Sequence, residues 1–307
     1  MRLIKAVEAS DWLAPRYWLT WAIIAVMRLV ALLPLPAIVV LGWVLGLLAY
    51  LMSPRRRRVA EINLRIAFPD ASSREIRRLT MICFGNLGVA AFELGLAWWE
   101  HARIRAMCEF EGLEHLSAAL KQGRGAILLT AHFTCLEIGG PALGQHVPFQ
   151  VMYKRAHNAL FDAFMRYHRS DYGGAAVDHH KPIALIKGLR KGYATWYAPD
   201  HDFGSKDTIF VPFFGVDATA LTAPARIAQI SGAPVVPYYI RRKPRGRGYE
   251  LRILPPLEDF PTGDAERDAR IINEVIERMI RRNPRQYLWS HKRYKNRPAG
   301  QPPVYPA

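Results

Sequence analysis

The stretch that decides the fold is AILLTAHFTCLE, residues 126–137. Its first five residues suit a short buried strand, and polar side chains follow at once. Similar apolar runs recur at 149–153 (FQVMY), 194–197 (ATWY), 209–213 (IFVPF) and 234–240 (PVVPYYI). Segments with helical spacing of apolar residues lie near 113–121, 159–172, 182–190, 218–231 and 265–282. This alternation predicts an α/β fold with a mostly parallel sheet.

Polar residues follow four of the predicted strands. In open α/β sheets, chemistry collects at the carboxyl ends of the strands, so these exits are the expected position of a functional site. They read AHFTCLE at 131–137, KRAHN at 154–158, APDHDFG at 198–204 and RRK at 241–243.

His132 and Glu137 are the first candidate pair. In one continuous helix, side chains five residues apart point about 140° apart, so the two can meet only across a strand-to-helix turn. A neutral imidazole could then take a proton from a hydroxyl while Glu137 holds the other ring nitrogen. Spacing alone favours a structural interpretation, in which a hydrogen-bonded histidine lies beside an unrelated helix glutamate.

A second candidate cluster is Asp200, His201 and Asp202. Together with His132 and the DHH run at 178–180 it could hold a divalent metal and serve phosphoester hydrolysis. In an extended segment, Asp200 and Asp202 would share one face while His201 pointed away. The alternative is ordinary turn chemistry before the following glycine.

Composition limits the class of partner. The chain has 307 residues, and 42 Lys+Arg against 26 Asp+Glu give a net charge of +16. Such an excess favours nucleic acid, an acidic protein or a phosphorylated membrane surface. Two basic clusters, at 241–247 and 292–297, could face phosphates. Three scattered cysteines exclude a disulfide framework or a thiolate cage.

Several enzyme classes lose support because their motifs are missing from the sequence. It contains no P-loop, no G-x-G-x-x-G after a strand and no G-x-S-x-G elbow. Kinase-like, dinucleotide-linked and serine-esterase functions are therefore disfavoured. Cys135 as a nucleophile is also disfavoured, because a lone cysteine among apolar neighbours is usually a small hydrophobe.

The N-terminal part predicts membrane attachment. Residues 33–52 carry no charge and match the roughly 20 residues of one bilayer crossing, and four arginines follow at 55–58. By the positive-inside rule the downstream chain is expected in the cytoplasm. The stretch 18–30 reads as an interfacial helix. The alternative is a buried helix hairpin.

This division predicts two parts: an interfacial segment and anchor at 1–53, and a cytoplasmic α/β domain at 54–307. Apolar residues at helical spacing predict helices at 57–67 and 72–99, the second opened by a Ser72/Glu75 capping box.

With these pieces in order, the chain resembles the lipid A late acyltransferases, the lauroyl/myristoyl branch of the lysophospholipid acyltransferase superfamily. The resemblance covers nearly the whole length and rests on ordered blocks. They are RRRR with EINLRIAFP, HFTCLE, YKRAHNALFD, WYAPDHDFG with IFVPFFG, APVVPYYIRRKP with GRGYEL, and PRQYLWSHKRYKNRP.

The resemblance implies a glycerol-3-phosphate-acyltransferase-like fold, a mixed sheet flanked by helices with one N-terminal membrane-anchoring helix. It implies transfer of a fatty acyl chain from acyl carrier protein to a hydroxyl of a (Kdo-)lipid A precursor. His132 would be the general base, with Glu137 as its partner. The acyl thioester is a co-substrate, and neither a cofactor nor a metal is expected.

Other site residues follow by position in the same blocks. Lys154 stands where these enzymes commonly have arginine, and Arg155 where they often have proline, so either could contact a phosphate. The family pattern is matched by Asn158, Asp162, Asp200, His201, Asp202 and Gly204.

The resemblance places the chain in a Gram-negative inner membrane, single-pass, with its catalytic domain on the cytoplasmic side. Its expected partners are acyl carrier protein, the lipid A precursor and anionic lipids, and not nucleic acid. Two other functions stay open: a metal-dependent phosphoesterase on the His/Asp cluster, and a membrane-tethered basic module without enzymatic activity.

Overall fold

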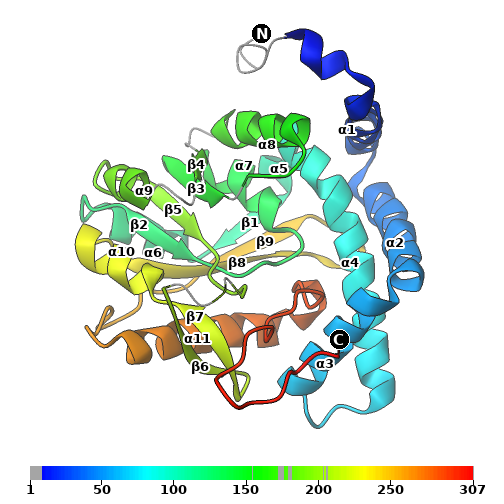
Figure 1. Cartoon of the computed structure of the whole chain (residues 1–307). Helices are drawn as coiled ribbons and strands as arrows, with labels where there is room; N and C mark the ends of the chain where they lie inside the picture. Colours follow the sequence, from blue (N-terminus) through cyan, green and yellow to red (C-terminus); the bar gives the residue numbers. More distant parts are fainter. Residues whose placement is uncertain are drawn as a thin grey trace.

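A seven-stranded mixed sheet forms the centre of the computed structural model, which describes residues 9–153, 155–171, 176–178, 182–202, 204 and 207–306. The strand order is β1-β9-β8-β2-β5-β3-β4 (Figure 1). The strands span Cys108–Glu111 (β1), Ala126–Leu129 (β2), Phe149–Tyr153 (β3), Ala176–Asp178 (β4), Ala194–Tyr197 (β5), Val235–Arg242 (β8) and Tyr249–Ile253 (β9).

The sheet is mostly parallel, as the sequence predicts. Strands β8, β2, β5, β3 and β4 run parallel to one another, as do β1 and β9, and only the β8–β9 pairing is antiparallel. Every residue of β2 and β5 is buried. Central parallel strands lie between two layers of helices, which is why these runs are apolar without alternation.

Two predicted elements differ from the structure. The run 209–213 forms β6, Thr208–Phe213, which pairs with β7, Val216–Leu221, in a separate antiparallel hairpin. The expected helix at 218–231 is divided, because its first residues belong to β7 and only Ala223–Ser231 (α10) is helical. The turn at Phe214 and Gly215, both at positive φ, folds β7 back on β6.

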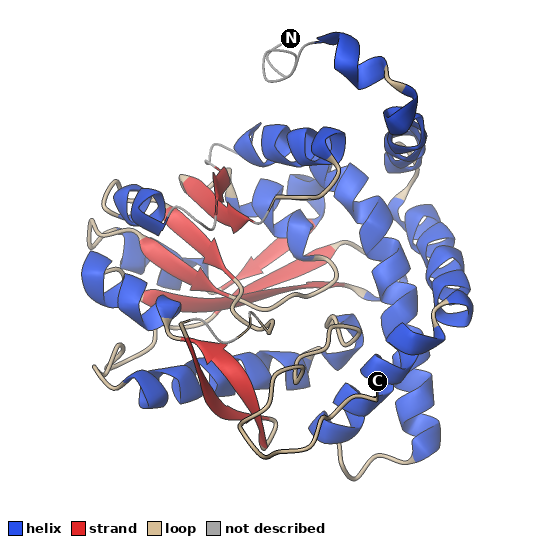
Figure 2. Ribbon diagram, viewed as in Figure 1, coloured by secondary structure: helices blue, strands red, loops and turns tan. Residues whose placement is uncertain are grey.

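Helices surround the sheet (Figure 2). The predicted helices at 113–121, 159–172, 182–190 and 265–282 are confirmed within one or two residues. The helical elements are α1 Trp18–Ala31, α2 Leu35–Met52, α3 Pro54–Ala67, α4 Ser73–Trp99, α5 His101–Met107, α6 Leu113–Leu120, α7 Gly139–Leu143, α8 Ala159–Asp171, α9 Pro182–Leu189 and α11 Ala265–Arg282, with short 3-10 turns that include Leu136–Ile138 (η4), Pro244–Gly246 (η5) and Pro284–Gln286 (η6).

The longest helix, α4, links the N-terminal helices to the sheet. It begins with the predicted capping box, in which the Ser72 hydroxyl accepts from Glu75 N and the Glu75 carboxylate accepts from Ser72 N. Further along, the buried Glu93 carboxylate binds the Arg242 guanidinium of β8 at 2.6 and 2.7 Å and accepts from the Tyr249 hydroxyl at 2.8 Å. Removing one partner of such a buried pair costs about 3–5 kcal/mol.

Helix α2 lies directly on α4 through glycine contacts. Gly42 faces Val89, and Gly46 faces the backbone of Phe84 and Gly85. A Cβ atom at any of these glycines would overlap the opposite helix, so their absence of a side chain sets the close approach. Leu35 and Ile38 of α2 belong to the same apolar core as Leu128 of β2.

The close contact between α2 and α4 predicts a sharp size limit. A Gly88→Leu side chain would overlap the Gly42 and Gly46 backbones, so we expect unfolding to become easier by about 1–3 kcal/mol or more. Denaturant unfolding in detergent measures this. Ala91→Leu, at an exposed position of the same helix, is the matched control. Equal stability of the two variants would contradict the packing described.

Candidate active site

His132 and Asp200 lie together where two adjacent central strands end. Strands β2 and β5 are parallel neighbours, and Thr130 N donates to Tyr197 O at 3.0 Å just before both chains leave the sheet. The His132 Nδ1 atom lies 2.7 Å from Asp200 Oδ1, and the His132 backbone N donates to Asp200 Oδ2 at 3.0 Å. The Asp200 side chain is fully buried, whereas the imidazole is about one-third exposed.

The electrostatics of this pair determine the tautomer of the ring. Burial raises the pKa of Asp200, but the nearby His132 and its hydrogen bonds outweigh burial and hold that pKa well below its ordinary range. An ionised carboxylate only accepts, so Nδ1 of His132 carries the proton. Nε2 is then the ring atom that can accept one.

The pKa of His132 is raised above its ordinary value. Desolvation lowers it, but the Asp200 charge and hydrogen bond, and less strongly the Glu137 charge, raise it by more. The ring therefore stabilises an added proton, which is what a general base needs when it removes one from a hydroxyl.

Two further imidazoles continue a stack that begins at the His132 ring. The His201 ring lies on it at 3.6 Å between centroids, and His291 lies on His201 at 3.9 Å. Burial lowers the pKa of His201 to about 3 and that of His291 to about 4, so both rings are neutral at pH 7. The expectation that His201 points away is wrong, because the chain after Asp200 bends and is not extended.

Glu137 takes a different partner from the one predicted. Its carboxylate pairs with the Arg169 guanidinium of α8, with Nε donating to Oε2 at 3.2 Å. The chain enters a 3-10 turn at Leu136, and Nδ1 of His132 is already bound to Asp200. The structure thus places Asp200 in the orienting position that the sequence predicts for Glu137.

The other predicted binding residues have varied positions. Lys154 lies outside the described residues, as do His179 and His180, and Arg155 is exposed. The Asn158 side chain caps α8, accepting from Phe161 N at 3.0 Å, and donates to Thr20 Oγ1 of α1 at 2.8 Å. These contacts show that Asn158 caps α8 and joins it to α1.

Asp202 anchors the C-terminal segment to the site. Its carboxylate accepts from Gly204 N at 2.9 Å and from the backbone and side-chain nitrogens of Asn296 at 2.9 and 2.6 Å. The sequence puts these residues 94 positions apart, so no local pattern could predict the contact.

The same C-terminal segment holds the loop that carries His132. Thr134 N donates to Gln286 O at 2.7 Å, and Leu288 N donates to His132 O at 3.0 Å. The Gln286 side chain in turn clamps the Arg242 backbone, accepting at 2.8 Å and donating at 3.0 Å. Gln286 and Leu288 lie in the block PRQYLWSH at 284–291, but their spacing alone does not indicate a role at the site.

Known proteins similar to this chain share one activity. The family model of bacterial lipid A biosynthesis acyltransferases matches residues 7–296. The chain belongs to this family. It is 40% identical to the lipid A biosynthesis lauroyltransferase of Escherichia coli over 95% of this chain and 96% of that protein. It is 36% identical to the palmitoleoyltransferase of the same bacterium, over 97% of each chain, and 30% identical to its myristoyltransferase, over 94% and 90%.

The basic clusters of this acyltransferase are less available for phosphate than the sequence suggests. Arg242 is only 5% exposed and bound to Glu93, and Arg293 is buried and donates to Thr219 O at 2.7 Å. Arg241 pairs with Glu250 on the adjacent strand. The expectation that the whole 241–247 cluster faces phosphates is wrong for Arg242.

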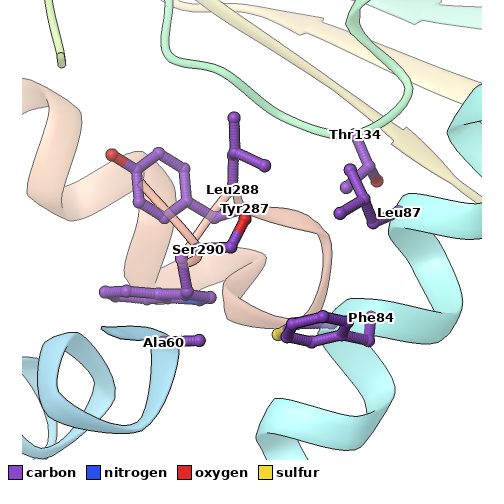
Figure 3. Close-up of a pocket in the computed structure, with 9 residues that line it drawn as sticks. Ala60, Phe84, Leu87, Thr134, Tyr287, Leu288 and Ser290 are labelled. Carbon is purple, nitrogen blue, oxygen red and sulfur yellow. The ribbon is translucent and has the colours of Figure 1, made fainter. Parts of the chain in front are cut away.

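A small apolar pocket lies beside the loop that carries His132 (Figure 3). Thr134 of that loop meets Phe84 and Leu87 of α4 there, and Ala60 of α3 lies near the base of the view. The remaining lining residues are Cys83, Tyr287, Leu288, Trp289 and Ser290. The pocket shows that the loop and the C-terminal segment leave some space between them on the α4 side.

A metal fits the histidine cluster poorly. Ligand atoms of His132, Asp200 and His201 lie within 4.8 Å of one another, but the two rings are stacked only 12° from parallel. Imidazole binds metal in its own plane at about 2.0–2.1 Å, and two nearly parallel rings stacked with centroids 3.6 Å apart are poorly placed to hold one ion in both planes. The geometry therefore argues against the phosphoesterase alternative.

Chelation provides a direct check of that conclusion. Treatment of the purified acyltransferase with EDTA is expected to leave acyl transfer unchanged, with less than stoichiometric metal by elemental analysis. Loss of activity with chelator, recovered by one added divalent metal, would instead support a metal-dependent reaction.

The raised pKa of His132 predicts an acid limb in the pH–rate profile. A general base works when deprotonated, so kcat/KM should fall as the pH drops through the raised pKa of His132. Asp200→Asn removes the main source of the raised pKa and should move this limb to lower pH. Glu137→Gln should move it less, because its charge contributes less.

Comparing the two variants in one assay separates their roles. Both replacements are close in shape to the residues they replace, so folding can be checked by the same thermal unfolding measurement. A larger shift in Glu137→Gln than in Asp200→Asn would mean that Glu137, and not Asp200, is the working partner of the ring.

Proposed function

We propose that this acyltransferase transfers a fatty acyl chain from acyl carrier protein to the hydroxyl of a 3-hydroxyacyl group on a (Kdo-)lipid A precursor, with His132 as general base. The observation that carries the proposal is the His132–Asp200 hydrogen bond of 2.7 Å at the carboxyl ends of two central strands. Family membership supplies the reaction class and the lipid A acceptor.

The chemistry uses the two nitrogens of one ring. Nδ1–H stays bonded to Asp200, and Nε2 takes the proton of the acceptor hydroxyl as its oxygen attacks the thioester carbonyl. The tetrahedral intermediate then expels the carrier thiolate, which takes the proton back from Nε2. An ester bond replaces a thioester bond, and no cofactor enters the balance.

Glu137 contributes in this scheme as a second negative charge near the ring. Its ion pair with Arg169 fixes both side chains at the edge of the site, with Arg169 only 12% exposed. The Glu137 charge raises the pKa of His132 and the charge of its partner Arg169 lowers it, while Asp200 holds the orientation of the ring. The contacts around the ring thus support a base with two carboxylates of unequal weight.

Charge complementarity supports the proposed substrates. The net charge of +16 suits an acidic carrier protein and a phosphorylated lipid, and Arg155 is exposed next to the site-bearing end of β3. Lys154 and Arg155 are the residues we assign to phosphate contact. The enzyme would work at the cytoplasmic face of a Gram-negative inner membrane, without nucleic acid.

The decisive variant is His132→Ala. Loss of a general base should lower acyl transfer by about 10²–10⁴-fold while the protein stays folded. The assay uses acyl carrier protein charged with a defined fatty acid and a lipid A precursor, with the product measured by mass spectrometry. His115→Ala on α6, outside the site, is the matched control.

The outcome can contradict the proposal in two separable ways. Turnover of His132→Ala at the rate of the control variant would remove the general-base role. Absence of an acylated lipid A product with the unmodified enzyme would instead remove the proposed substrates and leave the site chemistry standing.

A further inference from the structure

The outer faces of α1 and α2 expose many large apolar side chains. On α2 the exposed fraction is 63% for Val40, 53% for Val44, 68% for Leu51 and 79% for Met52. The same surface continues on α1, where Leu19, Ile23 and Val26 are exposed. A large exposed apolar patch on a folded protein marks a surface that binds another protein or a membrane.

The inner face of α2 is fixed to the rest of the protein along most of its length. Leu35 and Pro36 at its start lie against Gly246 of η5, Gly42 and Gly46 in its middle lie on α4, and the Tyr50 ring near its end packs on Phe84. Eighteen helical residues span about 27 Å. The helix is therefore a side of the folded body and not a projection from it.

Helix α4, on which α2 lies, cannot follow it into hydrocarbon without breaking buried polar contacts. It is long and apolar enough to cross a membrane, but just over half of its most apolar stretch is buried inside the protein, against 22% for α2. Its Glu93 binds Arg242, and its Asn86 donates to Arg285 O at 3.0 Å. These bonds tie α4 to the sheet.

Exposed arginines lie at both ends of α2. Arg245 and Arg247 belong to the β8–β9 turn that contacts its first residues, and Arg55, Arg56 and Arg58 follow its last. If α2 crossed a bilayer, these two groups would sit at opposite surfaces. Because α2 packs along its length on the same folded body that carries both groups of arginines, the two groups fit the headgroup level of a single membrane surface.

We propose that α1 and α2 lie flat in one leaflet of an anionic bilayer and that the chain does not cross it. The apolar face enters the acyl region, and the arginines at both ends of α2 bind lipid phosphates. This departs from the single crossing expected from the length of 33–52. The proposal stands independently of the acyl-transfer mechanism.

The flat arrangement brings the leaflet close to the catalytic site. Thr20 of α1 accepts a hydrogen bond from Asn158, which caps α8, and the Trp21 ring packs on Phe164 of α8. Helix α8 also carries Arg169, the partner of Glu137. A lipid acceptor could therefore reach the site from the leaflet that holds α1.

Cysteine accessibility tests the topology in cells. In a Cys108→Ser background, where Cys83 and Cys135 are buried, single cysteines replace Arg16 before α1 and Arg55 after α2. A membrane-impermeant maleimide is added to intact spheroplasts and to lysed ones. A flat helix pair places both cysteines on the same side, so their labelling should change together on lysis. Labelling of one from outside, with the other protected until lysis, would overturn the proposal.

A depth measurement tests the same geometry with purified protein. Nitroxide labels replace Val44 and Leu51, both exposed on α2, in vesicles of phosphatidylglycerol and phosphatidylethanolamine. A flat helix holds both labels at equal depth. A crossing helix would put the Leu51 label about 10 Å nearer the headgroups, since seven residues rise about that far. Unequal depths of that size contradict the proposal, and an acyl-transfer assay of the labelled protein reports separately on the site.

Discussion

The buried carboxylate of Asp200 is the constraint around which the site is built. An isolated buried charge costs several kcal/mol, so its oxygens need partners held in place. The His132 ring and backbone N supply them at 2.7 and 3.0 Å. Because Asp200 follows β5 and His132 follows β2, the bond also joins two neighbouring strand ends. The orientation of the ring and most of its raised proton affinity follow from this one contact.

The surroundings of the pair keep that geometry fixed. The C-terminal segment bonds to the backbone of the His132 loop through Gln286 and Leu288, and Gln286 also clamps Arg242, which Glu93 of α4 holds. A continuous path of hydrogen bonds thus runs from the loop that carries His132 to α4, the helix that supports α2. The site and the apolar surface belong to one folded body.

The sequence predicts the α/β class, most strands and the position of the site, because buried parallel strands read as apolar runs with polar exits. It does not predict which carboxylate meets His132. Glu137 is near in sequence, but a 3-10 turn directs it to Arg169, whereas Asp200 arrives from a strand 68 residues away. The roles of Gln286 and Asp202 depend on similar long-range contacts. The sequence does not predict strand β7, because its alanine-rich residues also suit a helix.

Asp200 sets the tautomer of His132 and most of its raised proton affinity. Nitrogen NMR of the His132 ring, followed through a pH titration, measures both directly. We expect a neutral ring protonated at Nδ1 with a raised pKa; both properties are lost in Asp200→Asn, whereas Glu137→Gln keeps the tautomer and lowers the pKa by less. A neutral ring protonated at Nε2, or a pKa that only Glu137→Gln lowers, would contradict it.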